Sequence, residues 1–512
     1  MNARGRVFVL FRSGLGLVFL AAFLSLAVQL RDLAGSRGLL PWADFLARLH
    51  QGGGWPGRFL SFPTLFLWVP GDAALTIVPL LGAAIALLLV LGIGGRLVPL
   101  ALWFLYLSCV TAARDFFYYQ WDNLLLETSF LAIFLPGRGS LFDLARGRPV
   151  PEPPSTTVFL VKWILFRLLF ESGLAKIAAG KDTWLNLTAM TYYYETAPLP
   201  SWGGWLVQQF PLWFHQFSVL FTFFVELPLA LLIFLPRRFR LAFFAIHLPF
   251  QVSIGATSNY GFFNLLSIVL SLTALQDRDL DAARRIARRM MRRMESDTPG
   301  QAAPAGDAAP GAPYPPWRRA LSLAPALLLA LFVVPASLVE ALGYFAPAAV
   351  QGPALLSVRA FYAPFRSVNV YHLFPGVVRE RIVAEIEGTS DGVRWEPYHL
   401  RYAPGDPRDA PPMTYLHNPR LPFHYSFWTL GRGRRDDEYI SNLARRLCCE
   451  PAVVAHLFKD DPFPATTPSA LRIVYYRYRF GRYADLTLGN YWLREPVGAP
   501  TRPYTCSCRQ GP

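Results

Sequence analysis

The sequence predicts a polytopic α-helical membrane protein of about seven to nine spans, followed by an extracytoplasmic C-terminal α+β domain that is rich in β-strands. Of its 512 residues, 53% are hydrophobic and only 16% are charged, a balance that is rare in soluble proteins of this size. Apolar stretches of nearly bilayer-spanning length recur up to residue 342. After that point, apolar and polar residues alternate in short segments, and this period of two is typical of β-strands.

Nine apolar stretches are long enough, or nearly long enough, to cross a bilayer. They are residues 7–29, 74–94, 97–113, 122–136, 157–177, 211–235, 240–258, 262–275 and 319–342. Two of them, 122–136 and 262–275, are short, so each could be tilted, re-entrant or buried among other helices. The predicted number of spans is therefore about seven to nine.

The arginines predict which way the chain crosses the membrane. The net charge is +15, and basic residues concentrate in five connections between apolar stretches: residues 1–6, 94–96, 137–148, 236–240 and 278–294. With alternating spans these five connections fall on one side, which the positive-inside rule assigns to the cytoplasm. The C-terminal region then lies on the opposite side. Because the basic residues follow the spans instead of covering one soluble face, we predict no nucleic-acid partner.

Composition divides the chain into four parts. They are a helical membrane domain (1–294), a disordered cytoplasmic linker (295–317), a last transmembrane helix (318–343) and an extracytoplasmic β-rich domain (344–512). The linker is rich in Ala, Pro and Gly and has no apolar pattern that could pack. In the last part, RIVAEIEG (381–388) and VRWEPYHLRY (393–402) flank a TSDG turn and predict a hairpin. LRIVYYRYRF (471–480) predicts another strand, and residues 436–458 have helical spacing.

The predicted span at 157–177 carries charged residues near one end. An ionisable group at the centre of a spanning helix costs roughly 2.5–3.5 kcal/mol. Lys176 lies about one turn from the outer end, so it could extend to the headgroups. Glu171 lies deeper and needs a partner, and Arg167 is four residues away, at the favourable helical spacing. We therefore expect structural ion pairing here in preference to catalysis.

Other polar residues lie within or beside the apolar stretches. The full intramembrane set is Asp122, Asn123, Glu127, Arg167, Glu171, Glu226 and His247, and Asn259, Tyr260 and Asn264 lie in the SNYGFFN motif. Such groups avoid lipid and face the bundle interior or a water-filled cavity. They gather toward the outer ends of the spans, which predicts either a polar chamber open to that side or a packing device.

The connection at 178–210 combines aromatic bulk with stiff prolines. Its candidate binding residues are Trp184, Tyr192, Tyr193, Tyr194, Glu195, Pro198 and Pro200, together with Asn259, Tyr260 and Asn264 from the next outer connection. Aromatic residues at a membrane edge are ordinarily an interfacial belt. A tyrosine run that leads into a proline turn could equally shape a binding surface for another protein.

Four of the five cysteines lie in the C-terminal domain, as the adjacent pair Cys448 and Cys449 and the pair Cys506 and Cys508. Either pair could be redox-active, or one cysteine from each could join the tail to the helix. In an oxidising compartment we favour a structural disulfide. Zinc prefers other spacings, so we predict no metal site.

Several long motifs resemble the lipase maturation factor family: FYYQWDNLLLETSFLAIFL, ESGLAKIAAGKDTWLNLTAMTYYYETAPLP, SNYGFFNLLSIVL, IEGTSDGVRWEPYHLRYAPGD, APPMTYLHNPRLPFHYSFW and DPFP. The resemblance runs from about residue 6 to residue 495, apart from the linker. It implies a multipass, chaperone-like protein of the endoplasmic reticulum membrane that assists folding and assembly of secreted lipases. The lumenal C-terminal domain would contact this client. A bacterial member would lie in the inner membrane with that domain in the periplasm.

A shorter stretch, SGLAKI followed by Trp184, is distantly similar to the vitamin K-dependent gamma-carboxylases. This resemblance implies an alternative function, an integral-membrane enzyme with Lys176 as the base acting on a quinone-type or lipid substrate. A maturation factor needs no cofactor, whereas the alternative would use a quinone or a lipid. The expected partners are a secreted lipase-like client and the membrane lipids.

Overall fold

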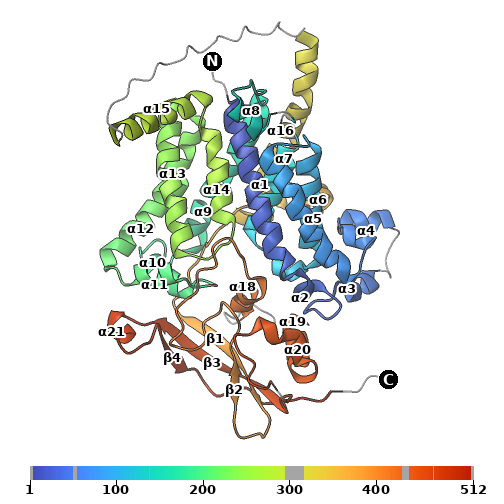
Figure 1. Cartoon of the computed structure of the whole chain (residues 1–512), viewed down its shortest axis with the longest axis vertical. Coiled ribbons are helices and arrows are strands. Elements are labelled where there is room, and N and C mark those ends of the chain that lie inside the picture. Colours follow the sequence, from blue (N-terminus) through green and yellow to red (C-terminus); the bar gives the residue numbers. More distant parts are fainter. Residues whose placement is uncertain are drawn as a thin grey trace.

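The computed structural model describes residues 4–49, 55–135, 137, 139–294, 316–428, 438–464 and 466–508. A bundle of helices forms one end of the molecule, and a C-terminal domain with a β-sheet forms the other (Figure 1). One hydrophobic core runs from the first helix of the bundle into the sheet. The chain is a multipass membrane protein with a separate C-terminal domain, as its composition predicted.

Each of the nine apolar stretches contains a helix. These helices are α1 (Gly5–Ala27), α5 (Asp72–Leu91), α6 (Leu97–Ala112), α7 (Gln120–Ala132), α9 (Ser155–Ala179), α12 (Leu212–Phe224), α13 (Arg237–Thr257), α14 (Phe263–Ser271) and α16 (Pro316–Phe345). Five helical stretches of the described chain are long and apolar enough to span a bilayer: Gly5–Ala27, Asp72–Leu91, Leu212–Phe234, Arg237–Thr257 and Pro325–Phe345. Leu97–Ala112 and Phe263–Ala274 are shorter apolar helices, in keeping with the expectation that some stretches are short.

Further helices, most of them short, lie between or after the helices of the apolar stretches. They are α2 (Leu30–Ala34), α3 (Trp42–Leu49), α4 (Trp55–Ser61), α8 (Leu141–Ala145), α10 (Ala189–Thr196), α11 (Trp202–Gln208), α15 (Asp277–Met294) and the 3₁₀ turns Leu65–Leu67 and Arg114–Phe117. α12 continues through a π-helical turn, Val225–Leu229, which contains Pro228, and a 3₁₀ turn, Leu232–Phe234. Proline removes one helical hydrogen bond, which suits such an irregular turn.

Small residues let α1 and α5 pack closely. A Cβ atom on Gly16 would lie 2.6 Å from the backbone nitrogen of Val90, and one on Gly82 would lie 2.5 Å from the ring of Phe23. Close approach at small residues is a common way for helices to associate in membranes, where burial of apolar surface gives little driving force.

The arginine-rich connections meet at the end of the bundle that lies opposite the C-terminal domain (Figure 1). Arg6 pairs with Asp281 of α15 at 2.6 Å, and Arg237 donates to Asp279 of the same helix. Arg96 donates to the carbonyl of Leu135. The linker predicted at 295–317 lies outside the described residues, except for its last two, which begin α16.

The C-terminal domain begins after α16 with the 3₁₀ turn Pro347–Val350, α17 (Pro353–Tyr362) and the 3₁₀ turn Ala363–Phe365. Its antiparallel sheet has the order β2-β1-β3-β4, with β5 also paired to β3. The strands are β1 (Arg381–Thr389), β2 (Glu396–Tyr398), β3 (Ala470–Phe480), β4 (Trp492–Pro496) and β5 (Tyr504–Thr505). The predicted hairpin is present as β1 and β2, although β2 is shorter than its alternating pattern suggested.

Helices pack beside the sheet. They are α18 (Arg420–Phe427), α19 (Glu438–Cys449), α20 (Pro451–Val454), the 3₁₀ turn Ala455–Leu457 and α21 (Tyr483–Leu486). The helical spacing over 436–458 corresponds to two helices in the described part of this segment, because α19 ends at Cys449 and Pro451 starts a new helix. Proline disfavours a helical conformation of the residue before it, and here that residue is Glu450.

Candidate functional site: the junction of the bundle and the C-terminal domain

Two segments of the C-terminal domain insert into the end of the bundle. The first inserted segment is 366–374 (RSVNVYHLF), and the second is 412–420 (PMTYLHNPR). Their backbone groups and polar side chains bind most of the charged and amide residues that the sequence placed inside the membrane half. Those residues therefore gather at one place, and protein segments fill the space between them.

Glu127 of α7 is the centre of the first group of contacts. Its carboxylate is fully buried and accepts hydrogen bonds from the Arg167 guanidinium, the Asn369 backbone N–H at 3.0 Å and the Tyr371 hydroxyl at 2.9 Å. Arg167 of α9 also donates to the Asn369 carbonyl at 2.7 Å. An ion pair that is also hydrogen-bonded on its remaining atoms meets the conditions under which charges are tolerated in an interior.

The expected pairing of Arg167 with Glu171 is wrong. Arg167 pairs with Glu127 on a neighbouring helix, and Glu171 accepts the backbone N–H of Tyr371 at 2.8 Å. The i to i+4 rule describes isolated helix surfaces. Here both side chains bind the first inserted segment, and this tertiary contact decides their partners.

Lys176 lies near the end of α9 and is buried. Its Nζ donates to Oε1 of Glu226 at 2.8 Å, to the Leu373 carbonyl at 2.9 Å and to the Ser172 carbonyl at 3.5 Å. The Trp184 ring lies 5.1 Å from Nζ, at the distance of a cation–π contact. Each of the three ammonium protons thus has an acceptor, and Lys176 does not extend to the headgroup region as the sequence allowed.

Asp122 and Asn123 of α7 bind arginines of the C-terminal domain. Arg420 holds Asp122 through two hydrogen bonds, Nη1 to Oδ2 at 2.5 Å and Nη2 to Oδ1 at 2.7 Å. Tyr106 adds its hydroxyl to the same carboxylate at 2.6 Å. Asn123 accepts from Arg366 at 2.7 Å. The planar fork of arginine matches a carboxylate, which gives this contact a fixed geometry.

Asn259 joins the second inserted segment to the outer connections. Its side-chain amide donates to the carbonyls of Leu199, Pro200 and Pro412, and its oxygen accepts the Thr414 N–H at 2.9 Å. Two other members of the predicted set bind within the bundle instead: His247 with Ser267 and Asn264 with Gln251.

The tyrosine run forms α10 and lies mostly inside the molecule. Tyr193 and Tyr194 are 8% and 6% exposed, and the Tyr193 hydroxyl lies 2.7 Å from that of Tyr260. The rings of both residues thus pack into the junction, and a role of this run in binding another protein stays a prediction. Tyr192 is half-buried at the same helix.

Two of the other predicted loop residues, Glu195 and Pro198, contact the sheet, and Trp184 contacts the first inserted segment. Glu195 accepts the Phe480 N–H at 2.7 Å, and burial raises the pKa of its carboxyl. Arg381 of β1 donates to the carbonyls of Ala197 and Pro198, and burial lowers its pKa to about 10. Trp184 donates from its indole to the Phe374 carbonyl at 3.0 Å.

Two cavities flank the first inserted segment. The first, of about 280 Å³, lies between α9, α10, α12 and α13, and Lys176 and Glu226 line it. The second, of about 310 Å³, lies between the α6–α7 connection, α10 and the inserted segment. Tyr193, Leu373 and Phe374 line both cavities. Pockets that are mostly apolar with a few polar groups are typical of small-molecule sites.

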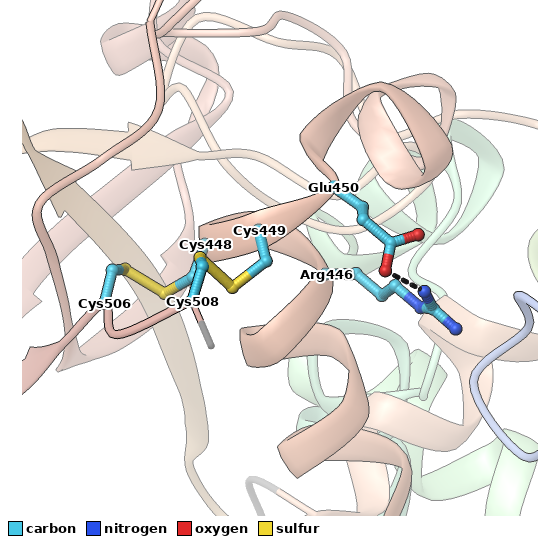
Figure 2. Close-up of a disulfide and its surroundings, with 6 residues drawn as sticks. All are labelled: Arg446, Cys448, Cys449, Glu450, Cys506 and Cys508. Carbon is cyan, nitrogen blue, oxygen red and sulfur yellow. Dashed lines mark hydrogen bonds and ion pairs between the residues drawn. A yellow bond between two sulfur atoms is a disulfide. The ribbon is translucent and has the colours of Figure 1, made fainter. Parts of the chain in front are cut away.

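The four C-terminal cysteines form two adjacent disulfides at the end of α19 (Figure 2). Cys448 joins Cys506, and Cys449 joins Cys508. The tail that follows β5 is thereby fixed to the helix. This arrangement uses one cysteine of each pair in each bond, which is the structural alternative that the sequence allowed.

Comparison with known proteins assigns the chain to a family. Residues 7–282 match the lipase maturation factor transmembrane domain, and residues 367–501 match the lipase maturation factor C-terminal domain. The chain belongs to the lipase maturation factor family. It is 32% identical to lipase maturation factor 1 of Bos taurus over 94% of this chain and 86% of the relative. It is 31% identical to lipase maturation factor 2 of Mus musculus over 95% of this chain and 81% of the relative.

A shorter alignment with another relative gives a higher identity. Lipase maturation factor 2 of Homo sapiens is 40% identical over 286 residues, which cover 53% of this chain and 40% of the relative. No solved structure matches the chain. The junction described above therefore lies between the two domains by which lipase maturation factors are defined.

Sequence reasoning missed the residues of this lipase maturation factor that bind the intramembrane charges from the C-terminal side. Asn369 and Tyr371 bind Glu127, and Arg420 binds Asp122. Arg366 binds the amide of Asn123, and Asn418 donates its backbone N–H to the Ser25 hydroxyl. One signal was present: HNPRLPF and FRSVNVYHLF each place an arginine beside apolar and aromatic residues. Arginines are common on soluble surfaces, so this signal alone does not identify them as junction residues. Their role becomes visible only from their partners, which lie 243 and 298 residues away in the sequence.

Proposed function

We propose that this chain is a membrane-anchored maturation factor that assists the folding and assembly of secreted lipases and performs no reaction itself. The observation that carries the proposal is the junction. Backbone groups of residues 366–374 are bound by Glu127, Glu171 and Lys176, so the C-terminal domain is held rigidly on the bundle. A factor that presents a surface to a client at the membrane needs such a support.

The proposal places the C-terminal domain outside the cytoplasm. Five arginine-rich connections lie at the opposite end of the bundle (Figure 1), and the positive-inside rule assigns that end to the cytoplasm. The two disulfides support the same orientation, because disulfides persist in oxidising compartments. In a bacterial cell this arrangement corresponds to the inner membrane and the periplasm, and in a eukaryotic cell to the membrane and lumen of the endoplasmic reticulum.

The client would bind apolar side chains on the C-terminal domain. Tyr483, Leu488 and Leu493 are 53%, 78% and 42% exposed and lie close together in the sequence, from α21 to β4. We call these three residues the client patch. Exposed apolar groups that cluster on a soluble domain favour binding of a protein that has not yet buried its own apolar segments.

The enzyme alternative, with Lys176 as a base, receives no support from the geometry. A base needs a free lone pair that faces its substrate, whereas the protons of the Lys176 ammonium are bound by three acceptors. The geometry supports a structural role for the lysine of the SGLAKI motif, because Lys176 holds the first inserted segment through the Leu373 carbonyl.

The test is co-expression of the chain with a secreted lipase, followed by measurement of active lipase outside the cell. Leu488→Asp combined with Leu493→Asp should lower the active lipase at least severalfold, while the abundance of the membrane protein stays unchanged. Val393→Asp is the matched control, because Val393 is 80% exposed and lies in the β1–β2 turn near the other edge of the sheet.

The enzyme alternative has its own variant. Lys176→Met with Glu226→Leu removes both charges of a buried pair, which is often tolerated, whereas loss of one partner is costly. The maturation factor should keep its effect on the lipase in this double variant. Loss of that effect at normal abundance and melting temperature would favour chemistry at Lys176 instead.

A further inference from the structure

The first cavity, between α9, α10, α12 and α13, opens toward the bilayer. Phe217 of α12 and Ser253 of α13 line it and are exposed, Phe217 by 56%. Both helices belong to stretches apolar enough to span a membrane, and most of their residues face outward. The mouth between them is therefore reached from the lipid. Trp202 and Trp213 are exposed near the same end, where aromatic residues mark the headgroup region.

The inner end of the cavity carries one buried acceptor without a partner. Oε1 of Glu226 accepts a hydrogen bond from Lys176. Oε2 of the same carboxylate has no hydrogen-bond partner among the described residues, and the residue is buried, with only 8% of its surface exposed. Leaving a buried acceptor unpaired is costly, and such exceptions call for an explanation. A ligand that donates a hydrogen bond to Oε2 would supply one.

The charges at this end restrict the class of ligand. Lys176 and Glu226 neutralise each other, so a net charge on the ligand would be buried without compensation. The protons of Lys176 already have acceptors, which leaves none for a fatty-acid carboxylate. A quinone offers only acceptor oxygens and cannot bind Oε2. A neutral hydroxyl group meets these conditions.

We propose that this cavity binds a single-chain neutral lipid with a hydroxyl group, of the kind found in long-chain alcohols and monoacylglycerols. The lipid enters between α12 and α13, its chain lies against the apolar walls, and its hydroxyl donates to Oε2 of Glu226. The volume of about 280 Å³ lies just below the range of about 300–1,000 Å³ for small-molecule sites, which suits one chain better than two. This site is independent of the client patch.

The experiment uses the full chain in phosphatidylcholine vesicles that contain a diazirine-bearing monoacylglycerol. After illumination, labelled peptides are mapped, and they should come from α9 and α12. Hexadecanol, hexadecanoic acid and methyl hexadecanoate then compete at equal mole fraction in the bilayer. The alcohol should displace the probe at about one-tenth of the concentration that the ester requires, because the ester cannot donate to a charged acceptor. The acid, tested at a pH high enough to ionise it in the bilayer, should compete no better than the ester.

Two tryptophan variants locate the mouth. Ser253→Trp should block it and lower the labelling at least about fivefold, a loss of the size expected when a well-fitting site is closed. Val252→Trp is the matched control, since Val252 is 55% exposed on the same helix and does not line the cavity. Labelling of this control should stay within about twofold of the unmodified chain.

Three results would overturn the proposal: labels spread evenly over the lipid-facing helices, equal labelling of the two tryptophan variants, or competition by the ester at the same concentration as the alcohol. The competition series uses the unmodified chain. The competition series therefore tests whether binding requires a hydroxyl group on the ligand, even if the Ser253→Trp variant does not fold.

Discussion

The ion pair of Asp122 and Arg420 should be the contact whose loss most weakens the junction. Both side chains are at most 2% exposed, the guanidinium makes two hydrogen bonds to the carboxylate, and it lies 4.1 Å from the Phe117 ring. Arg420→Met would leave the Asp122 carboxylate buried with only the Tyr106 hydroxyl as a donor. Removing one partner of such a pair costs about 3–5 kcal/mol.

The double variant distinguishes a buried pair from a sum of independent contacts. Asp122→Leu with Arg420→Met removes both charges, and replacement of a buried pair by apolar residues is often neutral. The double variant should therefore be more stable than either single variant, with a coupling energy of about 3 kcal/mol. The free energy of unfolding in detergent micelles, followed by tryptophan fluorescence, gives the three values, and limited proteolysis between the two domains reports whether the junction has opened.

A second pair between the two domains provides the control. Arg48 of α3 and Glu438 of α19 lie 3.1 Å apart, but their side chains are 57% and 43% exposed. Exposed pairs contribute about 0–1 kcal/mol, so Arg48→Met should leave the junction closed. The reasoning fails if Arg420→Met costs no more than Arg48→Met, or if the costs of the two single variants at Asp122 and Arg420 simply add in the double variant.

Three further predictions concern the C-terminal domain. Burial raises the pKa of the Glu385 carboxyl, so its stabilising contribution is fully present below the ordinary glutamate pKa of about 4.3 and is lost as pH rises through the folded-state pKa. Glu385→Gln should flatten the fall in melting temperature as pH rises above that ordinary value, and a steeper fall would contradict this sign. Gly388→Ala puts a Cβ atom 2.7 Å from an aromatic ring and should lower the free energy of unfolding by about 1–3 kcal/mol, whereas Gly376→Ala, with no atom within 4 Å, should change it little. The two disulfides span 58 and 59 residues, so replacing Cys448 and Cys506 together by Ser should cost little in chemical denaturation, and removal of both disulfides should cost about 4 kcal/mol.

The helices of the bundle could be predicted because one local property, apolar length, determines them. A span such as 74–94 needs no partner to be recognised, and α5 (Asp72–Leu91) lies within a few residues of it. The hairpin of β1 and β2 was predictable for the same reason, since alternation and a turn lie within one short segment. The break at Pro451 was also visible in the sequence, but helical spacing on both sides of it concealed the end of α19.

The partners of the buried charges could not be predicted from local rules. Arg167 has Glu171 one turn away, and yet its partner is Glu127, 40 residues earlier on another helix. Tyr371 and Glu127 are 244 residues apart. The cysteine pattern limited the choices without deciding them, because the two pairs allow either an internal bond or a bond between pairs. Spatial proximity of distant segments decides each case, and one sequence contains no measure of it.

Most polar groups of the membrane half act together to hold the C-terminal domain, whereas His247 and Asn264 bind within the bundle. If that domain moved away, Glu127, Arg167 and Glu171 would lose the backbone groups of residues 366–374 while remaining in a low-dielectric environment. Each unpaired buried group costs about 1–3 kcal/mol, and more when it is charged. Separation of the two domains is therefore strongly opposed by these contacts, in addition to the Asp122–Arg420 pair. The C-terminal domain thus keeps one orientation relative to the bundle.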